Sequence, residues 1–166
     1  MIFTDLAGGN SVFLDANALV YHFTQDPHFG PACSQLLQRI EVQEIQGFTS
    51  THVLSETAHR IMAIEAITTF SWPVAGIAQR LRQHPAQVKK LTGFRQAVER
   101  VLQSRIVVLN IQPILVAGAA EVSQQTGLLS NDALIVAVMQ ANGLTKLASN
   151  DADFDRVPGL SRYSPV

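Results

Sequence analysis

Short runs of apolar residues alternate along this chain with longer segments of helical periodicity. Val12–Leu14 is a continuous apolar run that ends at Asp15, and Ile106–Leu109 is short and rich in β-branched residues. Continuous apolar runs are typical of strands buried on both faces, and β-branched residues favour strands. We therefore expect strands at Val12–Leu14, Gly47–Ser50, Ile106–Leu109 and Lys146–Ser149, with a short edge strand at Arg162–Ser164.

The segments between these runs carry apolar residues at helical spacing. In the stretch after Ser50, for example, Val53, Leu54, Ala58 and Ile61 recur every three or four positions. Proline is favoured in the first turn of a helix, and glycine is favoured just after its end. The expected helices are residues 17–23, 31–40, 51–67, 73–81, 94–103, 113–124 and 132–141, with Pro73 opening the fourth, Pro85 interrupting the chain after it and Gly127 capping the sixth.

The order of these elements predicts the fold class. Strands separated by helices imply right-handed βαβ units and a parallel sheet that is covered on both faces. We therefore predict an α/β fold of three layers, α/β/α, with a central parallel sheet of about four to five short strands. No internal repeat or linker divides the sequence, so we expect a single domain over residues 1–166.

Composition limits the class of protein further. A hydrophobic content of 47% in 166 residues allows a buried core without disulfides or structural metals. Cys33 is the only cysteine, which excludes an internal disulfide and a zinc site of paired cysteines, so we expect a core thiol. No segment has the apolar length of a membrane span, and the first residues lack the pattern of a secretion signal. We expect a cytoplasmic location and no membrane partner.

Basic residues are unevenly distributed, although the formal net charge is −1. Seven of the 12 Lys and Arg residues lie between Arg80 and Arg105, and Glu99 is the only acid in that stretch. Such a stretch is either a solvated helix face or a surface that follows a phosphate backbone, and the sequence leaves both open. The candidate substrate-binding residues are Arg80, Arg82, Lys89 and Lys90.

Four carboxylates occupy positions where functional groups collect in open α/β sheets, just beyond the carboxyl ends of strands. Asp15 ends the first expected strand, and Asp151 follows the expected strand at Lys146–Ser149. Glu56 lies early in the helix after the second strand, and Asp132 lies in the first turn of its own helix. If that helix starts on the same side of the sheet, all four acids meet.

Each acid also has an interpretation that needs no ligand. Asp132 can complement the dipole of its helix, an effect of about 0.3 to 1 kcal/mol. Glu56 can pair with Arg60 one helical turn later, and Asp15 can accept hydrogen bonds from the turn that follows it. Spacing alone does not decide between these interpretations and a shared site.

The combination of acids is more informative than any one of them. Converging carboxylates repel one another unless a hard divalent cation neutralises them, and oxygen ligands favour Mg²⁺ or Mn²⁺ over zinc. His52 and His59 lack the spacing of a zinc hydrolase. An EF-hand at Asp151–Asp155 is excluded because Arg156 stands where glycine is needed, and Asp15–Asn17 lacks the second acid of a haloacid dehalogenase-type phosphatase.

Taken together, these residues resemble the PIN-domain family, and within it the VapC-type toxins of prokaryotic toxin–antitoxin pairs. Any one matching block would be weak, but the blocks occur in the expected order over nearly the whole chain. They are Val12–Asn17, Thr49–Glu56, Ser130–Ala137, Ala148–Phe154 and Val157–Leu160.

The resemblance implies a role for each acid. Asp15 would be the central metal ligand, Asp132 and Asp151 would complete the coordination, and Asp153 would be an additional, less constant ligand. Glu56 would position the attacking water. The catalytic set implied by the family is therefore Asp15, Glu56, Asp132 and Asp151.

The family pattern also indicates supporting residues and one departure. Asn17 and Ser149 fall where the family often has small polar residues that orient the acids. The segment Ala66–Gly93 is longer and richer in Pro and Arg than in a minimal member. This departure leaves substrate choice and the partner surface undetermined, while the acidic positions all match.

The implied activity is a Mg²⁺- or Mn²⁺-dependent endoribonuclease that cuts single-stranded or looped RNA and acts as the toxin of a toxin–antitoxin pair. Its expected partners are RNA, a cognate antitoxin and, more weakly, a second copy of the chain. Two alternatives stay open: a module that binds an antitoxin or another partner with little catalysis, and a housekeeping RNA-processing or structure-specific DNA nuclease. The near-neutral charge disfavours duplex DNA as the substrate.

Overall fold

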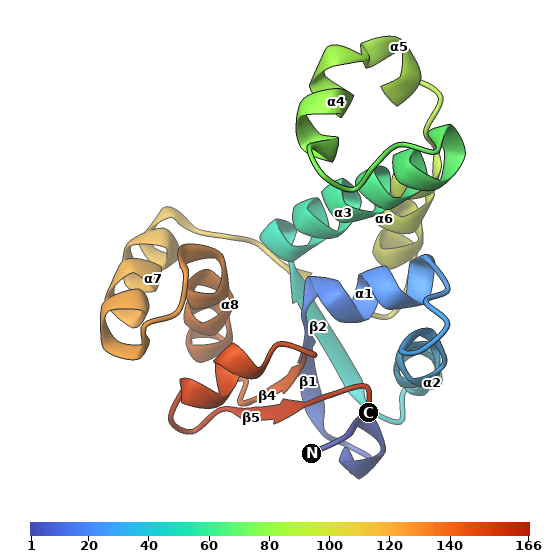
Figure 1. Ribbon diagram of the computed structural model, residues 1–166. Helices are drawn as coiled ribbons and strands as arrows, with labels where there is room; N and C mark the ends of the chain where they lie inside the picture. Colours follow the sequence, from blue (N-terminus) through green and yellow to red (C-terminus); the bar gives the residue numbers. More distant parts are fainter.

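The computed structural model describes residues 1–166 and is built around one parallel sheet (Figure 1). The five strands lie in the order β3-β2-β1-β4-β5, and every neighbouring pair is parallel. All five strands predicted from the sequence are present, and β5 lies at an edge as expected. Their bounds are β1 Ser11–Leu14, β2 Gln46–Ser50, β3 Val107–Leu109, β4 Lys146–Ala148 and β5 Ser161–Tyr163.

Helices cover both faces of this sheet, so the predicted three-layer α/β/α arrangement is confirmed. In Figure 1, α7 and α8 lie to one side of the strands, and α1, α2, α3 and α6 lie to the other. The helices are α1 Ala16–Phe23, α2 Gly30–Glu41, α3 Thr51–Phe70, α4 Ile77–Gln83, α5 Pro85–Val88, α6 Gly93–Gln103, α7 Pro113–Thr126 and α8 Ser130–Ala141, with short 3₁₀ helices at Phe3–Asp5 and Ala152–Arg156.

The core lies on the two faces of β1, the central strand. Val12, Phe13 and Leu14 are fully buried, which explains why this strand is an uninterrupted apolar run. Phe13 pairs with Phe48 of β2 on one side and with Leu147 of β4 on the other, so these three residues are aligned across the sheet. Strand order then brings the carboxyl end of β1 next to that of β4, although they are far apart in sequence.

Cys33 belongs to this core, as the sequence predicted. The side chain is fully buried in α2, and burial, with a smaller contribution from the negative charge of Asp26, raises the pKa of its thiol to about 12. The residue is therefore a packed apolar group and not a thiolate. None of the helices has both the length and the apolar character that crossing a membrane requires.

The hairpin of α3 and α6 extends beyond the sheet and carries α4 and α5 at its tip (Figure 1). We call residues 71–92 the α4–α5 lobe. The lobe has its own small core, in which Leu81 and Leu91 pack with Ala66 of α3. The carboxylate of Glu65 accepts hydrogen bonds from the backbone N–H groups of Thr92 (3.0 Å) and Gly93 (2.9 Å), and so ties the lobe to α3 at the start of α6.

The helix expected from Pro73 to Leu81 begins four residues later than predicted. Ser71 ends α3 in the left-handed conformation (φ 52°), and Gly76, with φ 74°, occupies the N-cap position of α4. Two left-handed residues on either side of Pro73 interrupt the chain, so Pro73 lies in a loop. Pro85, expected to interrupt the chain, does separate α4 from α5, but it also opens α5 at its first position.

Candidate functional site

Asp15 stands where β1 ends and α1 begins, and it is the most deeply buried acid of the predicted set. Only 7% of the residue is exposed. It occupies the N-cap position of α1, with Oδ1 accepting a hydrogen bond from the backbone N–H of Ala16 (2.6 Å). The strand-end turn foreseen for this residue is therefore present, but it accounts for only one of the two carboxylate oxygens.

The other oxygen of Asp15 is held by Asn17 and Ser149. Oδ2 accepts hydrogen bonds from Nδ2 of Asn17 (2.5 Å) and from the hydroxyl of Ser149 (2.7 Å). Asn17 also donates to Ser149 (3.0 Å), and its amide oxygen accepts the backbone N–H of Asn150 (3.1 Å). Because these side chains come from α1 and from the end of β4, the network joins two strand ends and fixes the rotamer of Asp15.

Burial determines the protonation of Asp15. Desolvation raises the pKa of this carboxyl from its ordinary value of 3.8 to about 6, against the opposing effect of the hydrogen bonds from Ser149 and Ala16. The negative charge of Glu56 raises it further, and the charge of Arg60 lowers it. The hydrogen bonds and the charge of Arg60 therefore do not fully compensate the burial of this carboxyl.

The pKa of Asp132, in the first turn of α8, is affected by the charges of three other predicted acids. Desolvation by partial burial raises the pKa of its carboxyl, and the charges of Asp151, Glu56 and Asp153 raise it further. Since Glu56 also acts on Asp15, the five acids form one electrostatically coupled group. These acids come from the end of β1, from α3, from α8 and from the loop after β4, and they lie close enough to affect one another's charge.

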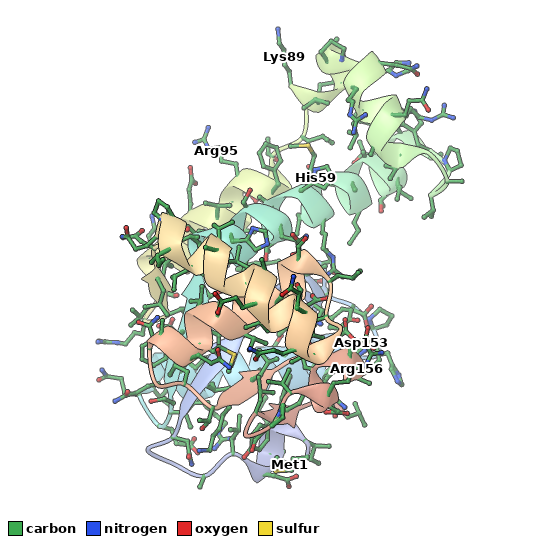
Figure 2. The ribbon with its side chains drawn as sticks, turned by 90° about the vertical axis from the view of Figure 1, so that its left-hand side faces the viewer. Met1, His59, Lys89, Arg95, Asp153 and Arg156 are labelled. Atoms are coloured by element: carbon green, nitrogen blue, oxygen red, sulfur yellow. The ribbon has the colours of Figure 1, made fainter.

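Asp151 and Asp153 are held by the 3₁₀ turn that follows β4. Asp151 caps this turn by accepting the backbone N–H of Asp153 (2.9 Å), and its own N–H donates to the hydroxyl of Ser149 (3.0 Å). The carboxylate of Asp153 pairs with Arg156 at 2.7 Å, and both side chains are about half exposed. Figure 2 shows the two side by side on the surface, so Asp153 is the most peripheral of the five acids.

Glu56 lies on α3 and is partly exposed. Its carboxylate is 3.7 Å from the guanidinium of Arg60, so the ion pair that the sequence allowed as an alternative is present. The pair is loose, and Glu56 still influences both Asp15 and Asp132. Beside it, a shallow recess of about 370 Å³ is lined by Asn17, Tyr21, Arg60, Asn150, Asp151 and Ala152.

The site provides carboxylate oxygens as candidate ligands but no preformed metal-binding cluster. No group of three or more His, Cys, Asp or Glu side chains stands ready to hold a metal ion. The donor chemistry nevertheless fits a hard divalent cation, because the coupled groups are all carboxylates and outnumber the nearby bases. Burial is the main cause of the raised pKa values of Asp15 and Asp132, and a bound cation would oppose it by stabilising both charged carboxylates.

The four basic residues that the sequence suggested for substrate binding are not part of this site. Arg80 and Arg82 lie on α4, and Lys89 and Lys90 follow α5, all in the α4–α5 lobe. In Figure 2, Lys89 lies at the tip of the lobe, at the end of the molecule opposite Met1 and away from Asp153. None of the four lines the recess beside the acids.

Sequence reasoning missed three polar residues that border the site. Tyr21 and Asn150 line the recess and contact each other through Nδ2 of Asn150 and the Tyr21 hydroxyl (3.4 Å). His52 lies close enough to Asp132 for its charge to lower the pKa of that carboxyl. Their positions did carry a signal: Tyr21 is one helical turn after Asn17, Asn150 directly precedes Asp151, and His52 is one turn before Glu56.

Comparison with known proteins identifies the family to which this arrangement belongs. The family profile described as "PIN domain" matches residues 12–160, which include all five acids described above. Ribonuclease VapC2 of Methanocaldococcus jannaschii is 28% identical over 151 residues, which make up 91% of each of the two chains.

Solved structures show the same fold at low sequence identity. The Mycobacterium tuberculosis protein VapC20, described as a sarcin–ricin loop cleaving toxin, superposes with a TM-score of 0.60 at 18% identity, over 87% of this chain and 92% of VapC20. VapBC2 from Rickettsia felis, solved bound to a DNA fragment from its promoter, gives a TM-score of 0.58 at 19% identity, over 93% of this chain and 98% of the matched chain. With the profile match over most of its length, the chain belongs to the PIN domain family.

Proposed function

We propose that this chain is a metal-dependent endoribonuclease and the toxin of a toxin–antitoxin pair. The observation that carries the proposal is Asp15, a buried carboxylate at the end of the central strand whose pKa is raised to about 6 beside Glu56. The ribonuclease and toxin names of the relatives support the same activity. Hydrolysis of a phosphodiester by such a site leaves a 5′-phosphate and a 3′-hydroxyl.

The cation in this proposal is Mg²⁺ or Mn²⁺, held by Asp15, Asp132 and Asp151, with Asp153 as a further ligand. When bound, it would neutralise charge on the scissile phosphate and lower the pKa of the attacking water. The coupling between these acids supports a shared cation, because each of them favours positive charge near the others. Because Asp153 is already paired with Arg156, we expect Asp153 to bind the cation more weakly than the other acids do.

The other side chains position the reacting groups. Asn17 and Ser149 hold Oδ2 of Asp15, so that the carboxylate is preorganised at the strand end. Glu56 accepts a proton from the attacking water, a role that its partial exposure and loose contact with Arg60 permit. The recess beside them is open enough for a single-stranded or looped RNA backbone to enter.

Partners and location follow from this activity as further proposals. A ribonuclease toxin requires an antitoxin to restrain it, and one of the matched structures is a toxin–antitoxin complex from Klebsiella pneumoniae. A chain that cleaves cellular RNA would act in the cytoplasm. Association of two copies also stays a prediction.

The decisive experiment compares the wild type with Asp15→Asn on labelled RNA and on DNA of the same sequence. We expect the wild type to cleave RNA with Mg²⁺ or Mn²⁺ and not with EDTA, and we expect Asp15→Asn to lose cleavage by at least about a hundredfold. Asp5→Asn is the matched control, because Asp5 is exposed in the N-terminal 3₁₀ helix. The control should cleave at the wild-type rate.

Each alternative gives a different outcome in these assays. Retained cleavage by Asp15→Asn would remove the proposed site. Binding of an antitoxin without any RNA cleavage would favour a partner-binding module, and equal cleavage of DNA would overturn the ribonuclease assignment. A map of the cleavage sites on total host RNA would then separate a toxin from an RNA-processing enzyme.

A further inference from the structure

The strongest feature outside the acidic site is an uncompensated positive charge on the α4–α5 lobe. Residues 66–98 contain five basic residues and no acid, which leaves seven basic residues and 13 acids in the rest of the chain. Arg95 is neutralised by Glu99 at 2.7 Å, but Arg80, Arg82, Lys89 and Lys90 have no acid within the stretch. Arg82, Lys89 and Lys90 are exposed. A polyanion is the ligand that this distribution fits.

Aromatic rings lie among these cations. The ring centroid of Trp72 is 4.9 Å from that of Phe70 and 5.2 Å from that of His84, and the Arg80 guanidinium lies 5.9 Å from the Trp72 ring. His84 is exposed and is held by a hydrogen bond between its Nδ1 and the carbonyl of Arg80 (2.8 Å). Flat rings among cations form the kind of surface on which unpaired bases stack.

Packing alone does not account for this surface. Trp72 packs against the small core of Leu81 and Leu91, which explains why it is partly buried. That core needs no cations, and an exposed histidine beside the indole adds nothing to it. An acidic peptide would satisfy the charges but would leave the rings unused, whereas single-stranded RNA uses both.

The lobe and the acidic site lie on one path. Within α3, the stretch from Glu56 to Phe70, which lies at the edge of the lobe, rises about 21 Å at 1.5 Å per residue. At about 3.4 Å per stacked nucleotide, this distance corresponds to about six nucleotides. One RNA strand therefore has the reach to occupy both places.

We propose that the α4–α5 lobe is an accessory binding site for single-stranded RNA, where bases stack on Trp72 and His84 and phosphates contact Arg82, Lys89 and Lys90. The inference rests on the proposed ribonuclease function and adds to it a requirement for substrate length. RNA that extends about six nucleotides from the cut is held at both ends of α3. Shorter RNA contacts the acidic site alone.

Binding of fluorescein-labelled, uridine-rich RNA to the full chain tests this proposal, with Mg²⁺ present and with phosphorothioate linkages in the RNA to slow its cleavage. One probe of about 20 nucleotides reaches the lobe, and one of about five does not. The variants are Lys89→Gln with Lys90→Gln, and separately Trp72→Leu, which removes the ring and keeps an apolar side chain. The control is Arg100→Gln with Arg105→Gln, the same loss of charge at exposed positions on and just after α6, outside the lobe.

We expect each lobe variant to weaken binding of the long probe about tenfold and to leave the short probe unchanged. For the lysine pair, the plot of log affinity against log salt should become shallower by about 1.4, at about 0.7 per phosphate contact on a single strand. The control pair should change neither quantity. Circular dichroism and thermal unfolding check that each variant is folded, and the exposed lysine pair tests the proposal even if Trp72→Leu is destabilised.

Unchanged binding of the long probe by the lysine pair would overturn the proposal. So would wild-type binding that does not increase from the short probe to the long one. If polyglutamate bound the lobe and the lobe variants did not change RNA binding, the lobe would instead be a site for an acidic protein. None of these binding results would contradict the proposed ribonuclease function. That function would be contradicted by a wild type that cleaves no RNA with Mg²⁺ or Mn²⁺.

Discussion

Asp15 is a buried carboxylate, and burying its charge costs free energy in the folded state. Asp15 is 7% exposed, and transfer of a charged group out of water is costly unless an opposite charge or hydrogen bonds compensate it. Three hydrogen bonds reach its oxygens, yet its pKa is still raised to about 6. The metal-free fold is therefore destabilised at neutral pH by the residue on which the proposed activity depends.

This cost predicts how stability responds to pH. Because the folded state binds the Asp15 proton more tightly than the unfolded chain, the metal-free wild type loses stability as pH rises from about 4 to above 6. Asp15→Asn removes the titration, so we expect this variant to be more stable than the wild type at about pH 8, by about 1 to 3 kcal/mol. Below about pH 4 the advantage should disappear. Urea unfolding in EDTA across this range measures the difference.

Asp5→Asn is the matched control, and its stability should follow the wild type at every pH. An advantage of Asp15→Asn that shrinks as pH rises would show that burial does not raise the pKa of Asp15. The prediction does not depend on activity, since no cation is present.

The sequence indicated the acids of the candidate site better than the contacts between them. Asp15 and Asp151 could be predicted because each follows an apolar run that ends a strand. The hydrogen bond from Ser149 to Asp15 spans 134 positions, and it exists because β1 pairs with β4. Strand order is not encoded in any local pattern, so without the family resemblance Ser149 would have remained an ordinary serine.

At the scale of elements, prediction succeeded where burial determines sequence. Strand β1 was found because its apolar residues face a core on both sides, and Gly127 caps α7 in the left-handed conformation as expected (φ 73°). Prediction was wrong where local backbone conformation decides, as in the loop around Pro73. A positive φ at Ser71 has no signal in the sequence, so the end of α3 and the delayed start of α4 could not be foreseen.

The contact between β2 and α2 predicts a steric effect at Gly47. A Cβ at this buried position would lie 2.6 Å from Cδ1 and 2.9 Å from Cγ2 of Ile40, a side chain that is itself 1% exposed. We expect Gly47→Ala to reduce the free energy of unfolding by about 1 to 3 kcal/mol, measured by urea denaturation. In an Ile40→Ala background the same change should cost at least about 1 kcal/mol less.

Gly118 supplies the opposite case. It lies inside α7, and a Cβ there would meet nothing within 4 Å. Gly118→Ala should therefore stabilise the protein by about 0.5 to 1 kcal/mol, through the lower entropy of the unfolded chain. A loss of stability at Gly118, or no loss at Gly47, would contradict the packing described for these helices.

At the scale of the whole molecule, charge is separated along α3. One end carries the coupled acids, and the other carries the basic lobe. RNA is a polyanion, so the lobe attracts it while the acidic end repels it until a cation is bound. Under the proposed function, this separation would let a chain of formal net charge −1 bind RNA, and the proposed cation would favour entry of the substrate as well as its cleavage.

The last prediction concerns the stability that the cation supplies. A ligand that binds only the folded state at about 100 times its Kd adds about 2.7 kcal/mol, which for a chain of this size corresponds to a rise in Tm of about 5 to 11 °C. We expect Mn²⁺ or Mg²⁺ to produce such a rise in the wild type and in Asp5→Asn, and to produce almost none in Asp15→Asn. The shift should increase between about pH 5 and pH 8, because binding requires the deprotonated form of Asp15, whose pKa is about 6. An equal shift in Asp15→Asn would place the cation elsewhere, since the central carboxylate would then contribute nothing to its binding.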